Sequence, residues 1–149
     1  MADPRIRVQA DSFDYGREVA GFGTGRRDVG AVVTFLGVVR DDAGTLDRME
    51  IEHYPGMTEK ALAAIVAEAT ARWALVDALV IHRHGTLRPG EAIMMVATAA
   101  RHRAAAFEAA EFLMDYLKSR APFWKKEFGP GGADWVAAKT EDEAALDRW

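Results

Sequence analysis

Cysteine is absent from this chain of 149 residues. Its absence excludes disulfide bonds, thiolate nucleophiles, zinc–thiolate sites and iron–sulfur clusters bound by the chain itself. The histidines are His53, His82, His84 and His102. His82 and His84 alternate on a strand-like run and should share a face, but two ligands without an obvious acidic third do not make a structural zinc site. We therefore expect no metal and no resident cofactor.

Long hydrophobic runs are lacking as well. None approaches the roughly 18 residues that cross a bilayer, and the first residues, MADPRIRVQADSFDYG, have no apolar signal core. No low-complexity tract, Pro/Gly-rich linker or internal repeat divides the chain. The net charge of −4 disfavours nucleic-acid binding. We expect a single soluble, cytoplasmic domain over residues 1–149, with no membrane contact.

Hydrophobic periodicity predicts an α+β fold. Helices are expected near residues 13–20, capped by Asp11 or Ser12, from a Thr58 cap to about residue 73, and after residue 103. Residues 17–28 are expected to form a mobile loop, and Gly37 to mark a bulge or a close backbone approach. Strands are expected at residues 6–9, 30–39, 46–54, 77–87, 91–100 and 135–136. A turn at residues 41–44 makes a hairpin of the second and third strands, and such hairpins with two main helices indicate α+β rather than a doubly wound sheet.

The segment from residue 112 to 127, FLMDYLKSRAPFWKKE, concentrates positive charge in an acidic chain. Lys118 falls on the last turn of the predicted helix, and Lys125 lies beyond the bend that Pro122 imposes. The helix dipole alone favours cations at such an end, by about 0.3–1 kcal/mol each, and Lys126 can be a solvated neighbour. Lys125 follows two aromatic residues and does not lie at a helix end, so the helix dipole does not explain its position. The cluster therefore suggests a pocket for an anion.

A second basic cluster, Arg101-His102-Arg103, precedes the same helix. This is the unfavourable end for cations, because the helix dipole is positive there. A docked anion would satisfy both the side chains and the free N–H groups. The alternative is that His102 and Arg103 pair with carboxylates such as Glu108 or Asp115. The helix between the clusters would be roughly 25–30 Å long, so either it is bent or shorter than it looks, or a second copy of the chain completes the site.

Long strings of this sequence resemble a known family. They are FLGVVR (35–40), EHYPGMTEKAL (52–62), IHRHGTLRPGE (81–91), RHRAAAFEAAEFLMDYLKSRAPFWKKE (101–127) and the tail around Trp135. Together they are similar to the large, catalytic subunit of molybdopterin synthase, the MoaE family, over nearly the whole chain.

The resemblance implies an α+β "hammerhead" fold and a sulfurtransferase. It implies a central homodimer with a small ubiquitin-like sulfur carrier at each end, which makes a heterotetramer. The carrier's Gly-Gly tail, activated as a thiocarboxylate, would supply sulfur to cyclic pyranopterin monophosphate to form the dithiolene of molybdopterin. Since this chain has no cysteine, a partner must deliver the sulfur.

The family's site residues carry over by position. Lys118 and Lys125 match its key lysines and are the expected catalytic residues, while the pocket lies near the dimer interface. Val38 stands where relatives carry a lysine. If the site uses only the backbone at this position, the substitution changes little. If the site uses the charge of that lysine, this chain binds phosphate more weakly. The expected substrate-binding residues are Val38, Val39, Arg40, His102, Arg103, Lys118, Lys125, Lys126 and Glu127.

Two other functions remain open on the sequence. One is a catalytically silent module that binds an anion or a pterin, and the other is a structural partner that only docks a ubiquitin-like protein. The retained lysines favour the enzyme, because a docking scaffold has no need of both.

Overall fold

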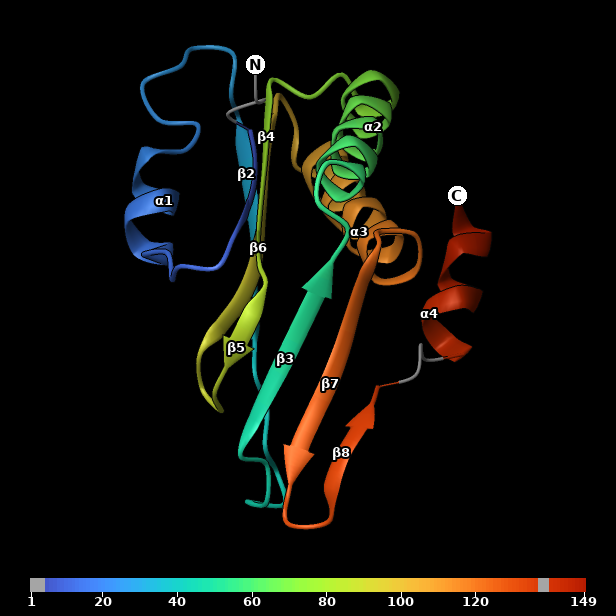
Figure 1. Ribbon diagram of the computed structural model, residues 1–149. Coiled ribbons are helices and arrows are strands. Elements are labelled where there is room, and N and C mark those ends of the chain that lie inside the picture. The colour runs from blue at the N-terminus through green and yellow to red at the C-terminus, as the bar shows by residue number, and fades with distance from the viewer. Residues whose placement is uncertain (1–4, 137–139) are drawn as a thin grey trace.

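The computed structural model describes residues 5–136 and 140–149 and builds them into two four-stranded sheets with helices on both faces of the first (Figure 1). The elements in chain order are β1 (Ile6–Gln9), α1 (Tyr15–Gly21), β2 (Ala31–Val38), β3 (Arg48–His53), α2 (Met57–Trp73), β4 (Asp77–Arg83), β5 (Gly85–Leu87), β6 (Ala92–Ala100), α3 (Arg103–Ser119), β7 (Phe123–Gly129), β8 (Gly132–Trp135), α4 (Thr140–Ala145) and a 3₁₀ turn (Leu146–Arg148). The predicted α+β class is confirmed.

The first sheet has the order β1-β4-β6-β2, with β1 parallel to β4 and the other pairs antiparallel. Figure 1 shows α2 and α3 covering one face of this sheet and α1 the other. The central strands β4 and β6 are buried along almost their whole length, as expected of strands covered on both faces. None of the helices among the described residues is long and apolar enough to cross a membrane.

The second sheet, of order β5-β3-β7-β8, contradicts the predicted hairpin of residues 30–39 and 46–54. Strand β2 pairs with β6, whereas β3 pairs with β5 and β7. The buried strand β6 needs a partner on each side, and β2 fills one of these places while β3 continues into the other sheet. Residues 77–87 likewise form two strands, because Gly85, with a φ of 90°, turns the chain from one sheet to the other.

Two predicted helix caps are wrong. Helix α1 is capped by Asp14, whose carboxylate accepts a hydrogen bond from the Arg17 amide at 3.0 Å, so the first residues of the expected 17–28 loop are helical. Helix α2 begins after Gly56, whose amide donates to the Glu59 carboxylate at 2.8 Å. The hydroxyl of Thr58 instead accepts from the Tyr54 amide at 3.0 Å and donates to the Pro122 carbonyl at 3.2 Å. This side chain therefore ties the start of α2 to the segment between α3 and β7.

The C-terminal tail packs back on the helices, as its terminal tryptophan suggests. The Trp149 ring makes edge contacts with Trp73 and Phe112, at centroid distances of 5.5 and 5.6 Å. Its indole N–H donates to the Asp115 carboxylate at 2.6 Å. The tail is thus fixed against α2 and α3, close to the C-terminal half of α3.

Candidate functional site

A cavity of ≈ 810 Å³ opens where the end of β2, the last turns of α3 and the start of β7 meet. Its walls carry several of the expected site residues together with apolar side chains of β2, β6 and α3. Those expected from the sequence are Val38, Val39, Arg40, Lys118, Lys125 and Glu127. Segments that are distant in sequence therefore build a single chamber around two amines and a guanidinium.

The bend after α3 brings the two lysines to the same cavity. Helix α3 ends at Ser119, and the amide of its C-cap, Arg120, donates to the Tyr116 carbonyl at 2.7 Å. The chain then reverses at Pro122 and enters β7, where Lys125 pairs with Ile51 of β3. Lys118 is exposed in the last helical turn and Lys125 is half-buried in the strand. The bend thus lets both side chains line one cavity.

A buried histidine lines the same cavity as the two lysines. His82 of β4 lines the cavity and is 5% exposed. Burial, together with the positive charges of Lys125 and Lys118, lowers its pKa to about 3. The imidazole is therefore neutral, and both amines are near enough to act on it.

The end of β2 presents backbone and one charge to the cavity. The β2–β6 register shifts between Gly37 and Val38, which confirms the bulge predicted at Gly37. The Val39 amide donates to the Glu91 carbonyl at 2.9 Å and its own carbonyl accepts from Gly90 at 2.8 Å, so this backbone is already bonded. Arg40 is exposed, with Asp42 at 3.6 Å as its neighbouring carboxylate. Its side chain is the cation of this segment that a ligand can reach.

Three expected binding residues do not line the cavity. His102 and Arg103 are exposed at the start of α3, which runs unbroken for 17 residues, or about 25 Å, to its other end. The bent or shortened helix is therefore excluded. Lys126 lies in the middle of β7, with its amine 5.1 Å from the centre of the Trp135 ring. Within one chain, these cations stay outside the chamber.

The alternative of internal pairing at the start of α3 is not supported either. Glu108 accepts a hydrogen bond from the Trp73 indole at 2.8 Å, and Asp115 accepts from Trp149 and Arg148 at 2.6 Å each. Within the described ranges, His102 and Arg103 make no ion pair. The Arg103 guanidinium therefore stands at the positive end of a helix dipole without a carboxylate to offset it.

Sequence reasoning missed His82 and Asp142 as cavity residues. From the sequence, His82 is a candidate for metal binding only, although a histidine inside a continuous apolar strand already indicates a buried polar group. Asp142 belongs to α4, whose docking brings the Asp142 carbonyl within 3.0 Å of the Ser119 hydroxyl. No local pattern could have placed it there. No group of three or more metal-ligating side chains exists among the residues that the structure describes.

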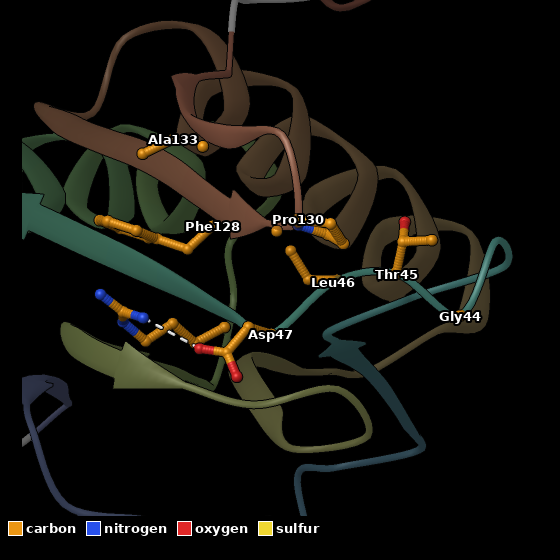
Figure 2. A pocket seen from close by; sticks show the side chains of 10 residues that line it. Gly44, Thr45, Leu46, Asp47, Phe128, Pro130 and Ala133 are labelled. Carbon is orange, nitrogen blue, oxygen red and sulfur yellow. Dashed lines mark hydrogen bonds and ion pairs between the residues drawn. The ribbon is translucent and has the colours of Figure 1, made fainter.

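A second hollow, of ≈ 630 Å³, lies at the other end of the second sheet (Figure 2). Leu46, Phe128, Pro130 and Ala133 give it an apolar lining. Its charged edge is an ion pair between Arg48 and Asp47 at 2.9 Å. None of the site residues expected from the sequence lines it.

Known proteins resemble this chain over most of its length. Residues 8–120 match the family model described as "MoaE protein". A "Molybdopterin synthase catalytic subunit" of Cereibacter sphaeroides is 69% identical over 97% of this chain and 99% of its own length. Among solved structures, the "Molybdopterin biosynthesis MoaE protein" from Burkholderia ambifaria has a TM-score of 0.83 at 52% identity, over 100% of this chain and 98% of its own.

A more distant structure shares the fold. It is titled "Protein-protein complex of subunit 1 and 2 of Molybdopterin-converting factor", from Helicobacter pylori, with a TM-score of 0.74 at 17% identity over 91% of this chain and 90% of its own. The match to the family model covers most of the chain, and the relatives align over nearly all of it. The chain belongs to the MoaE protein family.

Proposed function

We propose that this chain is the catalytic subunit of a molybdopterin synthase. It transfers sulfur from the thiocarboxylated C-terminus of a small ubiquitin-like carrier to cyclic pyranopterin monophosphate and so forms the dithiolene of molybdopterin. Support comes from the similarity to a protein of that name at 69% identity over 97% of the chain. The sulfurtransferase chemistry, the substrate and the cytoplasmic location are parts of this proposal.

The observation that carries the proposal is the convergence of Lys118, Lys125 and Arg40 on one cavity of an acidic protein. The cavity's ≈ 810 Å³ is within the range of small-molecule sites, roughly 300–1,000 Å³. A cyclic phosphate is an anion, and three cations around one chamber are suited to hold one. Because the chain has no cysteine, it cannot carry the sulfur itself.

The two lysines have the roles that the reaction needs. Moving sulfur from a thiocarboxylate to carbon breaks one carbon–sulfur bond and forms another, and the carrier's acyl carbon finally takes an oxygen from water. Each step moves protons and places negative charge on a carbonyl oxygen. Ammonium groups fixed at the chamber stabilise that charge and exchange the protons. Lys118 and Lys125 are the catalytic residues of this proposal, and Val38, Val39 and Glu127 line the substrate's path.

A second copy of the chain completes the site in this proposal. Arg103 is a cation at an unfavourable helix end, with His102 beside it, about 25 Å along α3 from Lys118. A homodimer that brings them to the neighbour's chamber would give them an anion to bind. With a carrier on each subunit the assembly is a heterotetramer, in keeping with the two-subunit complex named for the Helicobacter pylori protein. Lys126 lies outside the chamber and belongs in this proposal to the rim.

Reconstitution tests the function. The chain, a thiocarboxylated carrier and cyclic pyranopterin monophosphate are incubated together, and molybdopterin is measured after oxidation to a fluorescent derivative. The expected result is product that requires all three components. Carrier binding without product would favour the docking scaffold, and precursor binding without product would favour the silent pterin-binding module.

A further inference from the structure

His82 is the one buried histidine among the described residues, and two contacts fix its ring. Its Nδ1 lies 2.8 Å from the backbone carbonyl oxygen of Arg83. One face of the ring stacks on Phe123, with centroids 3.7 Å apart and planes 15° apart. A ring held by a hydrogen bond and a stacked neighbour has little freedom to turn, so the direction of its other nitrogen, Nε2, is set.

These contacts also fix the tautomer. A carbonyl oxygen only accepts hydrogen bonds, so Nδ1 carries the proton, and Nε2 of the neutral ring keeps a lone pair. The ring stays neutral because burial, with the charges of Lys125, Lys118 and His84, lowers the His82 pKa to about 3. The guanidinium of the next residue, Arg83, donates hydrogen bonds to the Glu91 carboxylate and to the Ala10 carbonyl.

Nε2 has no hydrogen-bond partner within the part of the chain that the structure describes. The atom is not sealed in the core, because among the described residues only Arg7 Nε and Thr70 Oγ1 are buried side-chain atoms without a hydrogen-bond partner. Because His82 lines the cavity, a partner can reach Nε2 from the chamber. That partner must be a donor, since a lone pair repels phosphate and carbonyl oxygens.

We infer that His82 is a specificity-determining residue whose Nε2 accepts a hydrogen bond from an N–H or O–H group of the bound ligand. The inference rests on the proposed function and deepens it. The cations Lys118, Lys125 and Arg40 bind the phosphate. His82 instead accepts a hydrogen bond from a donor on the non-phosphate part of the same molecule. A ligand bound by both groups has its direction in the chamber fixed, which cations alone do not achieve.

Three variants distinguish the contribution of the Nε2 acceptor to binding from that of the stacked ring. His82→Phe keeps the stacking on Phe123 and removes both nitrogens. His82→Asn retains an N–H near Nδ1 and loses the acceptor, whereas His82→Gln places an amide oxygen near the position of Nε2. Circular dichroism and the melting temperature of each variant identify those that fold.

Affinities for cyclic pyranopterin monophosphate and for inorganic phosphate are then measured by calorimetry. We expect His82→Phe and His82→Asn to bind the precursor about tenfold more weakly, with His82→Gln close to wild type. Affinity for inorganic phosphate should stay within about twofold in all three, because phosphate meets only the cations. If the variants lose affinity equally for both ligands, the Nε2 contact is with a lysine and the inference is overturned. It is also overturned if no variant changes the affinity for the precursor.

The wild-type protein gives a measurement that needs no folded variant. The ¹⁵N chemical shift of His82 Nε2 should move from that of a bare lone pair towards that of a hydrogen-bonded one when the precursor is added, and not when inorganic phosphate is added. An unchanged shift with bound precursor overturns the inference alone. Failure of the precursor to bind the wild-type protein at all would instead overturn the proposed function.

Discussion

The imidazole of His82 lies flat against the phenyl ring of Phe123, at 3.7 Å between centroids, and so joins the two sheets through a titratable group. Burial lowers the His82 pKa from 6.5 to about 3. Below about pH 6.5 the unfolded chain therefore binds a proton that the folded protein does not. The free energy of unfolding contributed by this group is complete above pH 6.5 and is lost as the pH falls towards 3.

This relation predicts an acid-sensitive fold. Between pH 6.5 and 5 the wild-type protein should lose about 1–1.4 kcal/mol of unfolding free energy per pH unit more than His82→Gln, which cannot titrate there. Urea denaturation of both proteins at pH 7, 6 and 5 measures the difference. Burial also lowers the pKa of His84, but that effect is common to both proteins. Parallel pH dependences would show that His82 does not stay neutral in the fold.

The tail should contribute measurably to stability through Trp149. Its ring packs on Trp73 and Phe112, and its indole N–H donates to Asp115. Trp149→Ala should lower the free energy of unfolding by about 2 kcal/mol, because the half-buried ring loses its contacts. Trp149→Phe, which loses chiefly the hydrogen bond, should cost about 1 kcal/mol. Equal and negligible effects in chemical denaturation would mean that the tail is not held as the structure shows.

The molecule should be a homodimer in solution. The cations at the two ends of α3 lie too far apart for one small ligand within a single chain. Light scattering at micromolar concentration should give about twice 16.3 kDa. A clean monomer under these conditions would contradict a site shared between subunits.

His102 and Arg103 should matter for binding more than for folding. Each sits at the positive end of the α3 dipole, so replacing one by alanine should leave the melting temperature unchanged or slightly raise it. Affinity for the cyclic precursor should fall by about tenfold or more, since charge-assisted hydrogen bonds contribute about 1.5–3 kcal/mol. A loss of several degrees in melting temperature with unchanged affinity would show that the two side chains are structural.

Local signals predicted most of the helices and strands. Helix α2 buries Leu62, Ile65, Val66 and Ala69, which are spaced three and four residues apart as in an amphipathic helix, and Pro122 marked the end of α3. Strand pairing was not predictable in the same way. Turn residues between β2 and β3 favour a hairpin locally, but the pairing is set by β6, which is distant in sequence and fully buried. Tertiary context therefore overrode the turn.

The site was predicted in part for the same reason. Lys118 and Lys125 carry a visible signal, because charge gathers in a short segment of an acidic chain. The roles of His82 and Asp142 depend on β4 and α4 folding against that segment. The placement of Lys126 depends on the alternation of side chains along β7, which the sequence did not identify as a strand.

The lysines are expected to be unequal. Lys118 projects from the rigid last turn of α3, and Lys125 from a strand beyond the bend. Lys118→Ala should therefore abolish dithiolene formation, and Lys125→Ala should impair it severely but less completely. Docking of the carrier should be retained in both, because it depends on a broad surface in which one amine is a minor contribution.

Product formation by Lys118→Ala with saturating thiocarboxylated carrier tests the catalytic assignment most directly. A parallel titration with the carrier and light scattering of the variant confirm that docking and assembly are intact. The predicted result is loss of molybdopterin formation by at least a hundredfold, the scale of removing a positioned acid–base group, with unchanged carrier affinity. Near-normal turnover by Lys118→Ala would contradict the catalytic role of this amine and would favour a docking or anion-binding function for the chain.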